Sequence, residues 1–341
     1  MDLPLRGIRV LAMEQAAALP YATRHLVDLG ADVIRVQAPA RSAAGVIEPG
    51  LLRGKRMLGL NLDVAGGPEA FLRVAARCDI VAHNYTPRVM RKYGIDFACV
   101  RAANPDVIYC ALTGFGSTGP WSQRPLFGPG AEAVSGHNLL IGAADAALPG
   151  RPGTLTYADF VCGTNLLLAM LAALHDQRSG RVAGARFVDI CLYETAVGQL
   201  APVLAERLVG GATPRRIGNA DAGYAVHGVW QVLGDALHRE GYVAIAATEA
   251  QRAACFGVLG VTGVDSIAGA VAGRSAEALV FALQAAGIAA AVVADAADVA
   301  TSAQLWGRGY FGRGAAARDA TAGAAQRAPD RKSTRLNSSH G

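Results

Sequence analysis

Asp159 is the residue whose type and position best support chemistry in this chain. It stands between an extended run at residues 154–158 and an apolar stretch at residues 160–174 that predicts a buried helix. A carboxylate at the start of such a helix faces free backbone N–H groups and the positive end of the helix dipole. Two interpretations follow. Asp159 is either an N-cap, for which Asp is a preferred residue type, or a nucleophile for covalent catalysis.

A glycine motif follows one of the predicted strands. Gly114-x-Gly116-x-x-Gly119 matches the dinucleotide-binding fingerprint in spacing, but Pro120 and Trp121 come next where that fingerprint needs the start of a helix. We therefore expect a glycine loop beside the Asp159 site and not a nicotinamide-nucleotide site.

The cysteines show no metal-binding pattern. The six are scattered, with no CxxC pair and no Cys/His cluster. Such spacing predicts reduced, mostly buried thiols in a cytoplasmic protein and argues against structural zinc or any other metal.

Composition limits the class of protein. The 341 residues are 52% hydrophobic and 17% charged, which predicts a folded protein large enough for two lobes. The net charge of +5 favours an anionic ligand but is too mild and dispersed to predict nucleic-acid binding. No apolar run approaches ~20 residues, so we expect no membrane span, and residues 1–6 do not resemble a signal peptide. The Ala and Gly content is typical of a GC-rich bacterial genome.

The order of predicted elements indicates the fold that positions Asp159. Strand, helix and strand at residues 7–12, 21–29 and 32–36 form a β-α-β unit, and the alternation continues to a predicted helix at residues 194–208. Alternating residues at 226–232 and 242–247 predict an antiparallel pair around Gly234-Asp235. The predicted fold class is α/β, with a Rossmann-like large domain at 1–209, a linker at 210–224 and a smaller α+β domain at 225–315.

The end of the chain differs in composition from the rest. Residues 330–341 lack the Ala/Gly/Val-rich character of the body and resemble a translated sequencing adapter, so we expect them to be a non-native tail. Residues 316–329 are alanine-rich, and we interpret them as a truncated C-terminal return segment.

Several segments together resemble the family III CoA-transferases, which include formyl-CoA and carnitine CoA-transferases. The matching segments, in the family's order, are residues 30–36, Gly54-Lys55-Arg56 before residues 60–63, Asn84-Tyr85-Thr86-Pro87 with Gly94, Asn104-Pro105 with residues 113–120, and residues 216–219 with 226–229. The resemblance extends from about residue 6 to residue 313. It implies that Asp159 is the catalytic aspartate, which exchanges an acyl group and CoA through an aspartyl-CoA thioester.

The same resemblance implies the partners. CoA acts as a substrate and no cofactor is permanently bound; an acyl-CoA and a carboxylic acid are the reactants, and the protein is an interlocked homodimer. The residues that fall on the family's CoA-contacting positions are Ala18, Asn84, Tyr85 and Lys92, with Gly114 and Gly116 in the loop beside the acyl site. Lys92 would meet a phosphate, or it is an ordinary solvated helix lysine. Ala17 and Ala38 stand where some members have Gln and Arg, which argues against a formyl- or oxalyl-type substrate.

Two alternatives remain open. The related α-methylacyl-CoA racemases use a histidine and a neighbouring aspartate, but Phe127 and Gly128 occupy those positions here. We interpret His137 as a pocket-lining or surface residue, and His227 as a structural one. The second alternative is an inactive CoA-binding fragment.

Overall fold

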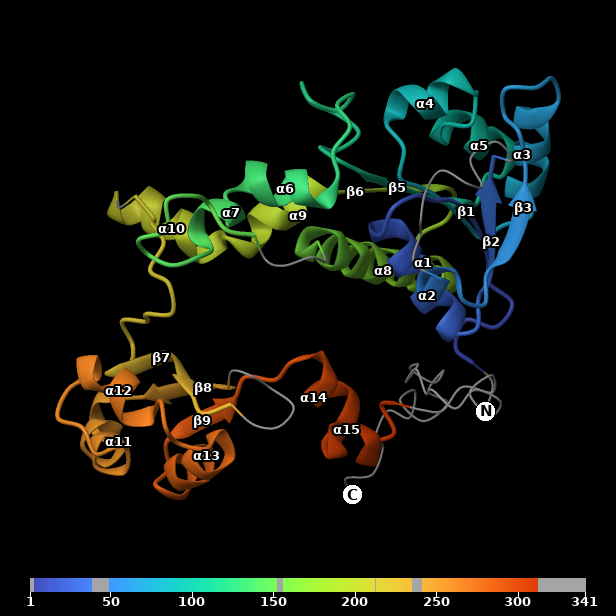
Figure 1. The fold of residues 1–341 in the computed structure, drawn as a ribbon. Coiled ribbons are helices and arrows are strands. Elements are labelled where there is room, and N and C mark those ends of the chain that lie inside the picture. Colours follow the sequence, from blue (N-terminus) through green and yellow to red (C-terminus); the bar gives the residue numbers. More distant parts are fainter. Residues whose placement is uncertain (1–2, 39–48, 152–155, 212, 235–240, 312–341) are drawn as a thin grey trace. The chain divides into compact units, whose positions relative to one another are not determined.

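The computed structural model describes residues 3–38, 49–151, 156–211, 213–234 and 241–311 (Figure 1). The chain divides into two compact units, Met1–Arg216 and Ile217–Gly341, with the division inside the predicted linker at 210–224. The predicted return segment at 316–329 and the predicted non-native tail at 330–341 lie outside the described residues.

The first unit contains a parallel sheet of six strands among the described residues. The strands are β1 (Arg9–Met13), β2 (Asp32–Gln37), β3 (Arg56–Gly59), β4 (Ile80–His83), β5 (Ile108–Thr113) and β6 (Arg186–Cys191). Their order is β3-β2-β1-β4-β5-β6, and every pair is parallel. This is the doubly wound order of the Rossmann fold, so the α/β fold class is confirmed. The order reverses between β1 and β4, where such sheets bind ligands at the carboxyl ends of the strands.

Helices cover both faces of this sheet (Figure 1). The helices of the first unit within the described residues are α1 (Ala18–Asp28), α2 (Pro49–Leu52), α3 (Gly67–Ala75), α4 (Pro87–Lys92), α5 (Phe97–Ala103), α6 (Gly128–Ser135), α7 (His137–Leu140), α8 (Tyr157–Arg178), α9 (Leu192–Gln199) and α10 (Ala201–Gly210). Alternate strand residues belong to two hydrophobic clusters: Val10 and Ile108 pack with α1 and α8, whereas Leu11 and Tyr109 pack with α3 and α5. Every residue of β4 and β5 is therefore buried, as expected for strands covered on both faces.

The start of α8 lies close to the start of α1. Gly163 permits this approach, because a Cβ at that position would be 2.5 Å from the carbonyl oxygen of Ala18. Gly163 is four residues after Asp159, so this crossing also fixes the first turn of α8 beside the β1–α1 loop. The expectation of extended backbone through residue 158 is wrong: α8 begins at Tyr157, with Thr156 as its N-cap.

The predicted single helix at residues 194–208 is two helices. α9 ends at Gln199 and α10 begins at Ala201. Pro202 lies in the first turn of α10, where its missing N–H costs nothing, but it could not continue α9 because it has no N–H to donate.

The second unit has its own sheet and core. β7 (Val226–Val232), β8 (Gly241–Ala247) and β9 (Ala289–Val292) are antiparallel, with Val226 opposite Ala247, so the predicted pairing is confirmed. Its helices are η2 (Glu249–Gln251), α11 (Arg252–Leu259), η3 (Val264–Ser266), α12 (Ile267–Val271), α13 (Ala276–Ala285), α14 (Ala296–Thr301) and α15 (Ala303–Gly307). The core includes Val243, Ile267 and Leu279. The turn at 235–240 lies outside the described residues.

Two described stretches, Tyr157–Arg178 and Glu249–Val271, have the length and apolar composition of a membrane span. The first is α8, whose residues Cys162 and Leu166 are buried in the core of the first unit. The second is a series of short helices interrupted by Gly260, whose φ of +74° ends α11. The first stretch is therefore a core helix of the first unit, and the second is not one continuous helix.

Candidate active site

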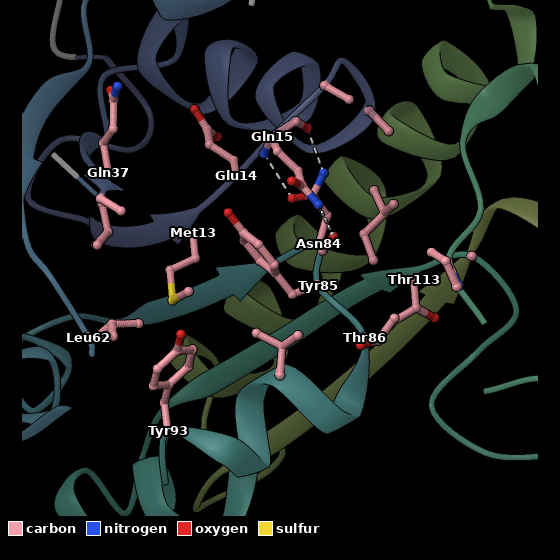
Figure 2. Close-up of a pocket in the computed structure, with 18 of the residues that line it drawn as sticks. Met13, Glu14, Gln15, Gln37, Leu62, Asn84, Tyr85, Thr86, Tyr93 and Thr113 are labelled. Atoms are coloured by element: carbon pink, nitrogen blue, oxygen red, sulfur yellow. Dashed lines mark hydrogen bonds between the residues drawn. The ribbon is translucent and has the colours of Figure 1, made fainter. Parts of the chain in front are cut away.

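A cleft of about 1140 Å³ opens at the carboxyl ends of the parallel strands of the first unit (Figure 2). Met13, Gln37 and Thr113 end β1, β2 and β5 at its wall, and Asn84 and Tyr85 follow β4. It therefore occupies the point at which the strand order reverses. The other residues used below that line it are Glu14, Gln15, Ala16, Ala18, Arg35, Ala38, Asp63, Lys92, Tyr93, Gly114, Leu126, Phe127 and Asp159.

Asn84 joins the two loops that flank this reversal. Its side-chain Nδ2 donates to the carbonyl oxygen of Gln15 at 2.7 Å, and its Oδ1 accepts from the backbone N–H of Gln15 at 2.9 Å (Figure 2). Ala16 follows with φ of +54°, the only positive φ among non-glycine residues in the described ranges. Such backbone strain persists where neighbouring contacts hold it. The side-chain amide of Asn84 is thus already committed to shaping the cleft wall.

Asp159 lies in the wall of the same cleft and is 7% exposed. It is the third residue of α8, so the N-cap interpretation is wrong; the hydroxyl of Thr156, the N-cap residue, donates to Asp159 Oδ2. Gly128, the first residue of α6, lies against the same carboxyl group: a Cβ there would be 2.8 Å from Asp159 Cγ. The carboxyl group is therefore held between the first turns of two helices.

Burial raises the pKa of Asp159 above its ordinary value, because the charged form loses solvent. The hydrogen bond from Thr156 opposes this effect by stabilising the carboxylate, and the negative charge of Glu132 adds to the increase. The result is a desolvated carboxylate that is more basic than an exposed aspartate, which suits nucleophilic attack on an acyl carbon.

Glu132, which the sequence analysis did not identify, is a completely buried carboxylate on α6. Its Oε1 accepts the backbone N–H of Ala158 at 3.3 Å, one residue before Asp159. Its Oε2 has no hydrogen-bond partner, and Arg151 Nε is 3.8 Å away. The signal in the sequence was an isolated charge within the small, apolar segment at residues 130–134, since buried Glu is rare without a partner.

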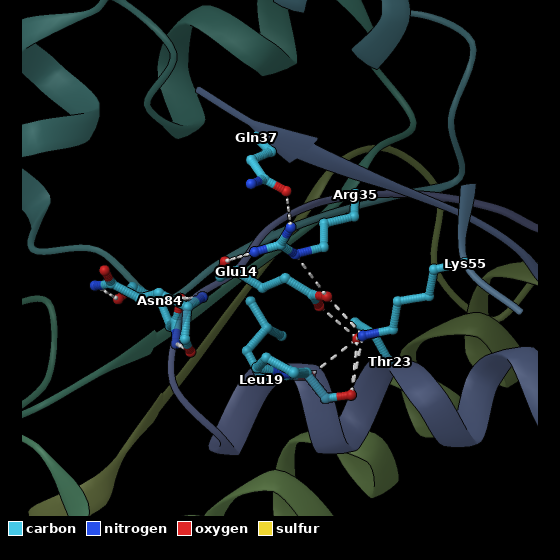
Figure 3. Close-up of polar contacts among 9 residues, drawn as sticks. Glu14, Leu19, Thr23, Arg35, Gln37, Lys55 and Asn84 are labelled. Carbon is cyan, nitrogen blue, oxygen red and sulfur yellow. Dashed lines mark hydrogen bonds and ion pairs between the residues drawn. The ribbon is translucent and has the colours of Figure 1, made fainter. Parts of the chain in front are cut away.

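A second buried charge cluster lies beneath the β1–α1 loop (Figure 3). Lys55 Nζ is 2.6 Å from Glu14 Oε1 and 2.7 Å from Thr23 Oγ1, and both charged side chains are fully buried. Arg35 Nε lies 3.5 Å from the same Glu14 oxygen. Burial lowers the pKa of Lys55, and Glu14 opposes that effect. These contacts fix Glu14, and with it the start of the loop that Asn84 holds through Gln15.

Most of the residues predicted to contact CoA or the acyl group line the cleft, with the exception of Gly116. Those in the cleft wall are Ala18, Asn84, Tyr85, Lys92 and Gly114. Lys92 does so as an exposed side chain, 2.9 Å from Asp63 Oδ1 and 3.0 Å from the hydroxyl of Tyr93.

The predicted glycine loop is only partly at the cleft. Gly114 must be glycine because a Cβ would be 2.5 Å from that of Leu126. Gly116 is outside the lining residues; it has φ of +90° and its N–H donates to Thr113 Oγ1 at 2.9 Å, so its role is to turn the chain. No helix starts directly after Gly119, because the next helix begins only at Gly128. The glycine motif therefore lacks the helix that a dinucleotide-binding fingerprint needs.

Of the two residues considered for the racemase alternative, Phe127 lines the cleft and His137 does not. Phe127 lines the cleft and is 59% exposed. His137 is buried outside the cleft lining, 2.9 Å from Ser135 Oγ, so the expectation of a pocket-lining or surface histidine is wrong. His227, in the second unit, donates from Nδ1 to the carbonyl oxygen of Asn219 and contacts the Tyr224 ring, and so has a local structural role.

The described residues contain no group of three or more His, Cys, Asp or Glu side chains arranged for a metal ion. All six cysteines are free thiols. The nearest to the site, Cys162, has its pKa raised to about 12 by burial and is uncharged at neutral pH.

Comparison with known proteins identifies the family. The chain matches the profile of CoA-transferase family III over residues 5–333 and belongs to that family. Among curated relatives, it is 32% identical to the succinate–glutarate CoA-transferase of Agrobacterium fabrum over 64% of this chain and 58% of the relative. It is 29% identical to the succinyl-CoA:glutarate CoA-transferase of Mus musculus over 73% of this chain and 58% of that protein.

Solved structures give the same answer for the fold. A CAIB/BAIF family protein from Brucella suis is 26% identical, with a TM-score of 0.78 and coverage of 92% of this chain and 90% of that chain. A hypothetical protein from Mycobacterium tuberculosis is 25% identical, with a TM-score of 0.74 and 91% coverage of both chains. The chain spans 58% of the length of the first curated relatives that it matches.

Proposed function

We propose that this protein transfers CoA from an acyl-CoA to a carboxylic acid, with Asp159 as the nucleophile. The observation that supports this most directly is a desolvated aspartate in the wall of a large cleft at the strand reversal of a family III chain. The cleft is roomy enough for a molecule larger than most drug-sized ligands, which need about 300–1,000 Å³.

The proposed reaction splits one transfer into paired displacements. The Asp159 carboxylate attacks the acyl carbon of the thioester, and CoA leaves as the thiolate. The thiolate then attacks the aspartyl carbonyl of this anhydride, giving an aspartyl-CoA thioester and the free donor acid. The acceptor carboxylate repeats these two steps in reverse order, and CoA leaves on the new acyl group. Backbone N–H groups at the starts of α6 and α8 are the candidate donors to the oxyanions.

The names of the curated relatives guide the choice of substrates. They give succinyl-CoA as donor and glutarate, L-malate or mesaconate as acceptors. We propose a donor and acceptor of this short dicarboxylic class, with CoA as a substrate and not a resident cofactor. We further propose a cytoplasmic homodimer with no nucleic-acid or membrane partner; light scattering of the purified protein tests the dimer.

The test combines trapping with turnover. The protein is incubated with succinyl-CoA alone, treated with hydroxylamine and digested, and the peptide containing Asp159 is examined by mass spectrometry for a hydroxamate. Transfer to glutarate is measured for Asp159→Ala and for Asp265→Asn, an exposed control in the second unit. We expect the hydroxamate on Asp159 and a loss of more than about 10³-fold only in Asp159→Ala. Transfer by Asp159→Ala at the wild-type rate would overturn the proposal.

The racemase alternative gives a separate result. Incubation of a 2-methylacyl-CoA in heavy water should leave C2 free of deuterium, because Phe127 provides no acid or base in the cleft. Rapid exchange that is lost in His137→Ala would replace the transferase proposal with the racemase one.

A further inference from the structure

Glu132 places a buried carboxylate beside the first turn of α8, which carries Asp159. Glu132 and Gly128 are four residues apart on α6 and so lie on one face of that helix. Gly128 lies against the carboxyl group of Asp159, and Glu132 accepts the N–H of Ala158, the residue before it. One face of α6 therefore holds the first turn of α8 and places a second carboxylate beside the first.

This charge is only partly compensated. Glu132 Oε2 is buried without a hydrogen-bond partner, and its ion pair within the described residues is with Arg151, whose Nε is 3.8 Å away and whose side chain is 45% exposed. An exposed partner is screened by water and compensates poorly. The other titratable groups at the pair are the buried His137 of α7, whose pKa burial lowers, and the neutral thiol of Cys162. Neither supplies a positive charge at neutral pH.

We propose that Glu132 is a positioning residue whose buried charge destabilises the free Asp159 carboxylate and so favours the covalent acyl and CoA adducts of Asp159. This inference rests on the proposed function. When Asp159 attacks, a C–O bond forms to the acyl carbon, the C–S bond breaks, and the electron pair leaves with the CoA sulfur. No proton moves. The negative charge is transferred from Asp159 to the thiolate, so the repulsion between the two carboxylates is relieved in the adduct.

The variant that isolates this effect is Glu132→Gln, because glutamine keeps an oxygen to accept the Ala158 N–H and removes only the charge. We expect kcat to fall about tenfold, because the repulsion that favours attack by Asp159 is lost, with the KM for succinyl-CoA within about twofold of wild type. The fraction of Asp159 trapped as hydroxamate should fall with kcat. The acid limb of the kcat/KM profile should move to lower pH.

Arg151→Gln gives the opposite test. Removal of this partner, the cation that pairs with Glu132 Oε2 in the described part of the chain, leaves the Glu132 charge less compensated, so the acid limb should move to higher pH. Glu194→Gln, an exposed carboxylate in the first turn of the neighbouring α9, is the matched control and should behave as wild type. A purely structural role for Glu132 would lower stability in Glu132→Gln and Arg151→Gln without moving their acid limbs in opposite directions.

The outcomes separate this inference from the proposed function. If wild-type protein gives no Asp159 adduct, the proposed function falls and the role of Glu132 falls with it. If wild type gives the adduct and Glu132→Gln gives the same amount with the same kcat and acid limb, only the role of Glu132 is overturned.

Discussion

Gly128 lies so close to Asp159 that a methyl group at Gly128 would be 2.8 Å from Asp159 Cγ. Any side chain at position 128 would therefore displace the Asp159 carboxylate or push α6 away from α8. Gly128→Ala should lower kcat/KM by at least about tenfold and reduce the melting temperature, because overpacking costs about 1–3 kcal/mol. Thermal unfolding and steady-state kinetics measure both effects.

Gly198→Ala is the control for this substitution. Gly198 is also helical, in α9, and a Cβ there meets nothing within 4 Å. Alanine should therefore raise stability slightly through its higher helix propensity, by up to about 1 kcal/mol, and leave activity unchanged. A Gly128→Ala variant that behaves in the same way would show that α6 and α8 separate without cost.

The raised pKa of Asp159 predicts that this carboxyl group, the proposed nucleophile, destabilises the fold at neutral pH. In the unfolded chain this carboxyl has a pKa near ~3.9, whereas burial and Glu132 raise it in the folded state. The folded state therefore holds the proton more tightly, and stability falls as pH rises from about 4 through the folded-state pKa. Asp159→Asn should consequently have a higher melting temperature than wild type at pH 7–8, and the difference should vanish below about pH 4.

The fold was largely predictable from sequence because strands and helices alternate along the first unit and its central strands, β4 and β5, are mostly apolar runs. The run at residues 108–112 is an example: all of β5 is buried, and its apolar composition alone indicates a strand covered on both faces. The break between α9 and α10 was missed although Pro202 signals it, because the apolar periodicity continues across the proline.

The site was predictable only in part. Asp159 was predicted as a site residue and lines the cleft. The pattern Thr156-x-x-Asp159 would have placed the start of α8 at Tyr157, because a hydroxyl residue three positions before an acid marks a helix start. The roles of Glu132 and Lys55 were not predictable, since burial of a charge depends on which distant segments pack around it. The side-chain brace from Asn84 to Gln15 spans 69 positions in the sequence, so no local pattern encodes it.

His83, the last residue of β4, should make the protein sensitive to acid. Burial lowers its pKa to about 4, and its Nδ1 accepts the Tyr85 N–H at 3.3 Å, which requires the neutral ring. The unfolded chain takes up this proton near pH ~6.5, so folding stability should be lost as pH falls from about 6.5 to 4, by up to about 3 kcal/mol. His83→Phe keeps a ring beside Tyr109 and should flatten this part of the stability profile. Urea unfolding at pH 7.5, 6 and 5 measures the free energy of unfolding of both proteins. An equal fall of this free energy with pH in wild type and His83→Phe would contradict the prediction.

The ion pairs of Glu14 with Lys55 and Arg35 predict that removing the charge of Lys55 and removing that of Glu14 have unequal effects. Lys55→Met leaves Glu14 with Arg35, 3.5 Å away, whereas Glu14→Gln leaves two buried cations without an anion. Breaking a buried ion pair from one side typically costs about 3–5 kcal/mol. Glu14→Gln should therefore be the more destabilising of the two variants in urea unfolding.

The pH dependence of that variant checks the cause. Without Glu14, burial and the neighbouring charge of Arg35 continue to lower the pKa of Lys55, while the unfolded chain keeps a value near ~10.4. The folded state then binds the proton less tightly, so stability should rise as pH increases through the folded-state pKa of Lys55 toward about 10. The deficit of Glu14→Gln relative to wild type should consequently shrink between pH 7 and 10, and the double variant Glu14→Gln with Lys55→Met should show no such recovery. A deficit that stays constant with pH in the single variant would mean that lost packing, and not an uncompensated Lys55 charge, destabilises the loop that shapes the cleft.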